Sequence, residues 1–131
     1  MNTTIKSNYY GDGKSAIIST LNEQPLYSDM ENFRPIDFLV GGYGTCMMSI
    51  MDKIGIENGF RISKAKTEIS YEMLTDNSRI DTLEIKCFIE DAHFTFEQKQ
   101  ILEQTALNKC PIGNSLHSDI KRRYEFIYGK Y

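Results

Sequence analysis

Two of the three cysteines stand in sequence contexts that favour thiol chemistry. Cys46 lies one helical turn beyond the Gly-Gly-Tyr-Gly run of residues 41–44, whose glycines could leave its sulfur accessible. Without such neighbours, a lone buried cysteine is most often a small hydrophobic residue. Cys110 precedes Pro111 and is expected at the N-cap of a helix, where the dipole and free N–H groups lower the pKa of a thiol. These two residues are therefore the candidates for redox or nucleophilic chemistry.

The remaining cysteine and the histidines favour packing or surface roles. Cys87 alternates with the apolar residues of a strand over 80–90, which predicts a core position. An alternative nucleophile pair is Cys110 with His117, which follows it by about two helical turns. A surface position for His117 is favoured over this pairing. The chain has no Cys-x-x-Cys, and His93 and His117 are far apart, so we expect no metal site. Residues 11–14 lack the spacing of a phosphate-binding loop, and no cofactor is expected.

Length and charge restrict the class of protein. The chain has 131 residues and a net charge of −3, which predicts one globular domain over residues 1–131 without a nucleic-acid-binding or polybasic membrane surface. Residues 1–6 hold no apolar segment, and no run of about 18 apolar residues occurs, so we expect neither a signal peptide nor a membrane span. Three cysteines do not fit a secreted disulfide framework. We therefore expect a cytoplasmic protein with reduced thiols.

Alternating apolar segments predict the strands. Gly11 and Gly13 favour a hairpin turn, because glycine adopts the positive φ that tight turns require. Residues 21–25 are expected to form a second turn. The segments on either side of the turn at residues 75–78 alternate strictly, which predicts an antiparallel hairpin. The expected strands cover residues 4–10, 14–20, 26–28, 64–74, 80–90 and 120–128.

A long apolar segment predicts a helix over residues 35–58. Pro35 suits the first helical position, and Asp37 in the first turn complements the helix dipole. Because the segment is apolar on nearly every side, we expect it to be buried on most faces. Its three glycines between residues 41 and 44 each cost about 0.8–1 kcal/mol against alanine, which indicates close approach by another backbone or a ligand. The alternative is a helix that begins only after Gly44.

The C-terminal third predicts two further helices. Thr95 and Gln98 form a capping-box pattern, so a helix is expected from there to about Lys109. A short helix is expected from Pro111 through Leu116, before the last strand. Strand pairs outnumber strand–helix–strand crossovers, so the predicted class is α+β with a mostly antiparallel sheet.

Both cysteine segments resemble those of the OsmC/Ohr family, the osmotically inducible protein C and organic hydroperoxide resistance proteins. Residues 34–46, Arg-Pro-Ile-Asp-Phe-Leu-Val-Gly-Gly-Tyr-Gly-Thr-Cys, are similar to the family segment Pro-x-Glu-Leu-Leu-x-x-Ala-x-x-x-Cys, with Asp37 at the acidic position. Residues 106–112, Ala-Leu-Asn-Lys-Cys-Pro-Ile, are similar to Ala-x-x-x-Cys-Pro-[Val/Ile]. The expected order of elements also fits, so the resemblance covers nearly the whole chain.

The resemblance implies an intertwined homodimer with a long central cysteine-bearing helix, a second helix and active sites at the interface. It implies a thiol peroxidase that reduces organic hydroperoxides in oxidative-stress defence. Cys46 would attack as a thiolate, Cys110 would resolve the sulfenic acid to a disulfide, and a dithiol would restore both thiols. Five apolar or aromatic residues are candidates to line a substrate pocket, although they suit plain core packing equally well: Phe38, Tyr43, Met47, Met48 and Met51.

The chain also departs from the Ohr pattern. That branch uses an arginine in the N-terminal strand region, held by a glutamate next to the proline, whereas this chain has no arginine before Arg34 and has Ile36 after Pro35. The departure favours the OsmC-like branch, with Lys14 and Arg34 as basic candidates and Asp37 as the acidic one. The alternative functions are an OsmC-like module that binds a small apolar ligand without efficient peroxidase activity, and a structural domain with three buried thiols.

Overall fold

The computed structural model describes residues 3–131, which divide between Val40 and Gly41 into an N-terminal and a C-terminal compact unit. Met1 and Asn2, the first residues of the segment in which no signal peptide is expected, lie outside the described residues. In the part of the chain that the structure describes, no helix is both long enough and apolar enough to cross a membrane. The expectation of a single domain over 1–131 stays a prediction.

The N-terminal unit contains an antiparallel sheet in the order β1(Ile5–Gly11), β2(Lys14–Ser19), β3(Asn22–Ser28). The turn between the first two strands has positive φ at Asp12 and Gly13, 55° and 75°, which confirms the predicted hairpin. The prediction of a turn over residues 21–25 is wrong. The chain turns at residues 20–21, and Pro25 lies inside β3, because an edge strand tolerates a residue without an N–H donor.

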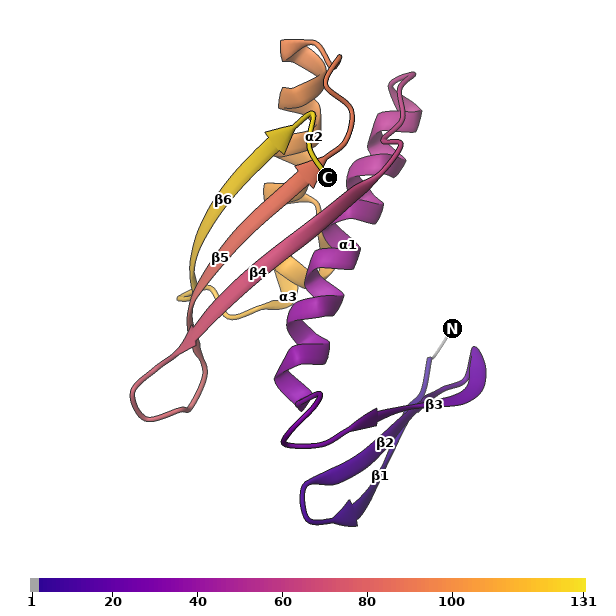
Figure 1. Cartoon of the computed structure of the whole chain (residues 1–131), viewed down its shortest axis with the longest axis vertical. Helices are drawn as coiled ribbons and strands as arrows, with labels where there is room; N and C mark the ends of the chain where they lie inside the picture. The colour runs from indigo at the N-terminus through magenta and orange to yellow at the C-terminus, as the bar shows by residue number, and fades with distance from the viewer. Residues whose placement is uncertain (1–2) are drawn as a thin grey trace. The chain divides into compact units, whose positions relative to one another are not determined.

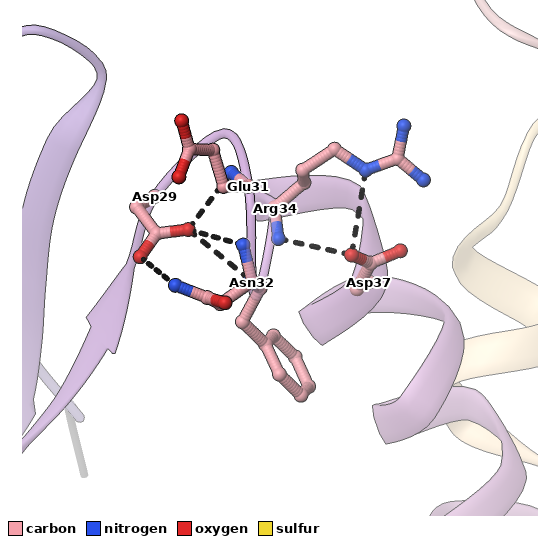
Figure 2. A network of polar contacts seen from close by, with 6 residues as sticks. Asp29, Glu31, Asn32, Arg34 and Asp37 are labelled. Carbon is pink, nitrogen blue, oxygen red and sulfur yellow. Dashed lines mark hydrogen bonds and ion pairs between the residues drawn. The ribbon is translucent and has the colours of Figure 1, made fainter.

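A hydrogen-bonded loop connects β3 to the next helix (Figure 2). The Asp29 carboxylate accepts hydrogen bonds from the backbone N–H groups of Glu31 and Asn32, and from the Asn32 side chain. The hydrogen bonds from Asn32 are the main cause that lowers the pKa of Asp29 to about 2. The Phe33 and Phe38 rings pack at 4.6 Å between centroids. This loop therefore has its own local order within the N-terminal unit.

The C-terminal unit carries the second sheet, in the order β4(Ala65–Met73), β5(Ile80–Ile89), β6(Lys121–Tyr128) (Figure 1). The β4–β5 pair is antiparallel, as predicted. The β5–β6 pair is parallel, since the chain crosses back through the helices α2(Phe96–Asn108) and α3(Pro111–Ser115) before it enters β6. The α+β class with mostly antiparallel pairing is confirmed.

Helix α1(Pro35–Glu57) begins at Pro35, as predicted, so the alternative of a start after Gly44 is wrong. Its buried side chains form one stripe that contains Tyr43, Met47 and Met51. The expectation of burial on most faces is wrong for the single chain, because Ile56 is 49% exposed on another face. An apolar sequence cannot itself decide how many faces of a helix meet other elements.

One face of the β4–β5–β6 sheet forms the core of this unit. Gly44 of α1 approaches Thr67 and Ile69 of β4. On β5, Cys87 is fully buried among the inward-facing residues, and burial raises the pKa of its thiol to about 12. The prediction that Cys87 is a core residue is confirmed.

The predicted capping box begins α2. The Thr95 hydroxyl accepts from the Gln98 N–H at 3.1 Å, and the Gln98 side chain accepts from the Thr95 N–H at 2.9 Å. Helix α3 is shorter than predicted: it ends at Ser115, with Leu116 as its C-cap. The α2–α3 break therefore falls at Lys109–Cys110 and presents Cys110 to the core.

Candidate active site

The C-terminal unit brings Cys46 and Cys110 together. Cys46 lies within α1 and is partly exposed, whereas Cys110 is the N-cap residue of α3 and is 1% exposed. The two thiols are close enough for interactions with Cys46 to raise the pKa of Cys110. All three cysteines of the chain are free thiols in this structure. Two residues that are distant in sequence thus form one dithiol site.

The environment of Cys110 differs from the expectation. Burial raises the pKa of the Cys110 thiol, the N–H of Gly113 donates to its Sγ at 3.5 Å and opposes this, and interactions with Cys46 raise the pKa further. The net direction is upward. The predicted net lowering of this pKa is therefore wrong: the backbone donors at the N-cap do lower it, but desolvation outweighs them in this five-residue helix.

Arg122 and Tyr124, which the sequence did not single out, form a cluster with the predicted pocket residue Tyr43 beside the turn that carries Cys110. The Tyr43 and Tyr124 hydroxyls are 2.5 Å apart, and the Arg122 guanidinium lies 5.7 Å from the centroid of the Tyr43 ring. Burial and the hydrogen bond to Tyr124 raise the pKa of Tyr43, whereas Arg122 opposes this. A signal was available, since Arg122 and Tyr124 share the inward face of an alternating strand while Arg123 faces solvent.

The predicted pocket residues divide between the two units. Tyr43, Met47 and Met51 are almost completely buried in the C-terminal unit, an environment that also suits plain core packing. Phe38 belongs to the N-terminal unit, where it packs on Phe33. A substrate-lining role for these residues stays a prediction.

The predicted charged residues all belong to the N-terminal unit. Lys14 is exposed and lines a hollow of about 340 Å³ with Asp29 and other polar residues of the same unit. The Asp37 carboxylate accepts from the Arg34 N–H at 2.9 Å, and its Oδ2 lies 3.5 Å from Arg34 Nε (Figure 2). This pairing caps the start of α1. A role for Lys14, Arg34 or Asp37 in thiol activation stays a prediction.

Other candidates have local explanations. His117 lies beyond α3, is exposed, and its Nδ1 accepts from the Asp119 N–H at 3.1 Å. The alternative pair of His117 with Cys110 thus has no support in the described geometry. Among residues 3–131, no group of three His, Cys, Asp or Glu side chains is arranged to hold a metal ion.

Comparison with known proteins decides the family. The family model for OsmC-like protein matches residues 28–125, a range that contains both cysteines of the site. The chain belongs to the OsmC-like family. No curated protein matches it.

Solved structures share the OsmC-like fold. A Psychrobacter arcticus protein of osmotic stress and detoxification response is 24% identical, with 96% of each chain covered and a TM-score of 0.86. An OsmC-like protein of Mycoplasma pneumoniae is 15% identical over 98% of this chain and 97% of that chain, with a TM-score of 0.83. The organic hydroperoxide resistance protein OhrB of Bacillus subtilis is 16% identical over 94% and 97%, with a TM-score of 0.68. These similarities extend over both units of the chain.

Proposed function

We propose that this OsmC-like protein is a thiol peroxidase that reduces organic hydroperoxides in defence against oxidative stress. The Cys46 thiolate attacks the O–O bond, its sulfur takes up one oxygen as a sulfenic acid, and the organic part leaves as an alcohol. The Cys110 thiolate then attacks that sulfur, so that an S–S bond forms, the S–O bond breaks and hydroxide leaves to become water. A dithiol reductant restores both thiols by two exchange steps and is itself oxidised to a disulfide.

The interacting thiols of Cys46 and Cys110 are the observation that carries this proposal. A thiol peroxidase that resolves within one chain needs its second sulfur within bridging distance of the first. The partly exposed Cys46 suits the residue that meets the hydroperoxide, and the buried Cys110 suits the residue that reacts only afterwards. The name of the Bacillus subtilis neighbour, an organic hydroperoxide resistance protein, supports the same reaction class.

We propose an intertwined homodimer as the working form, in a reducing compartment such as the cytoplasm. The described part of the N-terminal unit exposes nine large apolar side chains and buries two hydrophobic residues, Ala16 and Val40, and a second copy of the chain would cover the exposed ones. Light scattering at micromolar protein concentration tests this assembly. The exposed side chains are Ile5, Tyr9, Tyr10, Leu21, Leu26, Tyr27, Met30, Phe33 and Leu39.

Treatment of the reduced protein with one equivalent of cumene hydroperoxide is expected to link Cys46 to Cys110. Non-reducing peptide mapping measures this, with Cys87 as the internal control, because its full burial keeps it a free thiol. Thiols that stay free under excess hydroperoxide would overturn the proposal. Binding of a small apolar ligand would then be the function to test, by thermal shift in a Cys46→Ser, Cys110→Ser double variant.

The resolving step is expected to accelerate as the pH rises. Burial, followed by the interactions with Cys46, holds the pKa of Cys110 above its ordinary value, so the thiol is mostly protonated at neutral pH. Because only the thiolate attacks, the rate of disulfide formation should rise by up to about tenfold per pH unit below that pKa. Stopped-flow tyrosine fluorescence after a single hydroperoxide addition measures it. A rate that is already constant from pH 6 upwards (about two pH units below an ordinary thiol pKa) would contradict the expectation.

A further inference from the structure

Arg122 is a half-buried cation on the inner face of β6. Its strand neighbours Lys121 and Arg123 are exposed and form ion pairs with acidic residues of β5. Within residues 3–131, no carboxylate forms an ion pair with Arg122. Burial opposes its charge, but hydrogen bonding and charge interactions with Tyr124 and Tyr43 outweigh this and raise the pKa of Arg122. The charge of Arg122 is therefore stabilised by the two tyrosines.

The same guanidinium packs against the turn that carries Cys110. A Cβ placed on Gly113 would lie 2.9 Å from Tyr43 Cε1 and 3.3 Å from Arg122 Nη1, so both side chains pack closely against this glycine. The N–H of Gly113 donates to Cys110 Sγ at 3.5 Å. Gly113 thus lies against the arginine and the tyrosine ring and also donates to the Cys110 sulfur.

Tyr124 anchors this cluster to the sheet. Its hydroxyl is 2.5 Å from the Tyr43 hydroxyl, and its backbone lies in register with Ile85 of the central strand β5. Tyr43 belongs to α1 and precedes Cys46 by three residues, which is about one helical turn. The cluster therefore connects the sheet, the helix that carries Cys46 and the turn that carries Cys110.

We propose that Arg122 is a positioning residue: together with Tyr43 and Tyr124 it holds the Pro111–Ser115 turn against α1, so that the Cys110 sulfur stays within bonding reach of Cys46. The Arg122 guanidinium lies 5.7 Å from the centroid of the Tyr43 ring, and its planar form and five N–H donors suit an aromatic and hydroxyl environment that the point charge of a lysine does not match. This inference rests on the proposed function for the pairing of Cys46 with Cys110, but it can be tested without hydroperoxide.

The test is the thiol–disulfide equilibrium of the protein with glutathione. Cys46 and Cys110 together lose two electrons and two protons and form one S–S bond, while one glutathione disulfide is reduced to two thiols. The equilibrium constant measures the effective concentration of one thiol at the other. Arg122→Met should lower it by about tenfold or more, because small misplacements of reacting groups are costly. Arg122→Lys should recover only part of this loss.

Arg123→Met is the matched control, since Arg123 is the next residue and lies on the exposed face. It should leave the equilibrium within about twofold of the wild-type value, as expected for an exposed substitution. An unchanged equilibrium in Arg122→Met, or an equal loss in Arg123→Met, would overturn the positioning role.

Two further measurements separate positioning from general stability. In a Cys110→Ser background, Arg122→Met should leave the rate of sulfenic acid formation at Cys46 unchanged, as measured by dimedone labelling. Thermal unfolding of the reduced Arg122→Met variant should stay cooperative. A loss of Cys46 oxidation in parallel with the disulfide equilibrium would assign Arg122 a general structural role and refute the proposal. If Arg122→Met shifts the glutathione equilibrium but the wild-type protein does not reduce hydroperoxides, the proposed function is refuted and the positioning role of Arg122 is retained.

Discussion

Replacement of Cys46 by serine is expected to abolish hydroperoxide reduction. The serine hydroxyl is far less acidic than a thiol, and its oxygen cannot take up a peroxide oxygen as sulfur does, so the first step has no nucleophile. We expect turnover of cumene hydroperoxide with a dithiol reductant to fall by about a thousandfold or more, as when other enzymes lose their nucleophile. Coupled consumption of the hydroperoxide measures this. Without a reductant, Cys110→Ser should instead consume one equivalent of hydroperoxide and leave Cys46 as a sulfenic acid.

Cys87→Ala is the control for the Cys46 variant. Cys87 is fully buried on β5, and burial raises the pKa of its thiol to about 12, so we expect it to take no part in the proposed reaction. The Cys87 variant should lose some stability, from the missing sulfur volume, but retain its rate per folded molecule. Equal activity in Cys46→Ser and wild type would refute the proposal that Cys46 is the peroxidatic thiol. Loss of activity in a folded Cys87→Ala variant would instead indicate that Cys87 of β5 is the reacting thiol.

Gly44→Ala is expected to destabilise the protein although alanine is the better helix former. A Cβ at position 44 would overlap the Thr67 hydroxyl and lie 3.3 Å from the Cβ of Thr67, so α1 must move away from β4. Overpacking of this kind costs about 1–3 kcal/mol. Since Cys46 lies two residues further along α1, we also expect weaker Cys46–Cys110 disulfide formation. Chemical denaturation and the glutathione equilibrium measure the two effects.

Gly41→Ala provides the opposite expectation within the same helix. A Cβ at position 41 meets no atom within 4 Å, so the variant keeps the helix-propensity gain of alanine, about 0.8–1 kcal/mol. Its free energy of unfolding should rise, with the disulfide equilibrium unchanged. If both glycine variants changed the free energy of unfolding in the same direction, the close approach of α1 to β4 would not explain why position 44 requires glycine.

Local signals in the sequence predicted most elements of the fold. Strict alternation located β4 and β5, the capping box located the start of α2, and Pro35 located the start of α1. Each of these signals acts between neighbours in the chain, so the residues that carry it are consecutive or one turn apart. The predicted turn at residues 21–25 failed for the same reason. Whether Pro25 breaks a strand depends on whether that strand is at the edge of the sheet, which is not a local property.

The candidate site was predictable only in part. The contexts of Cys46 and Cys110 identified both sulfurs, and the resemblance of their segments indicated the OsmC-like family that the family model confirms. Alternation along the last strand places Arg122 on the same face as Tyr124, but it does not indicate which residues of other elements that face meets. The role of Arg122 depends on the parallel register of β6 with β5 and on the packing of Tyr43 over Gly113.

The sequence by itself determined which residues can do thiol chemistry in this protein, because side-chain type and the local signals for helices and turns depend only on neighbouring residues in the chain. Tertiary structure alone decided that Cys110 is buried beside Cys46, and that burial raises the pKa of its thiol although it caps a helix. It also decided that the nearby cation in this unit comes from β6. The physical reason is that desolvation and packing depend on what surrounds an atom in space, and residues far apart in the chain supply those surroundings.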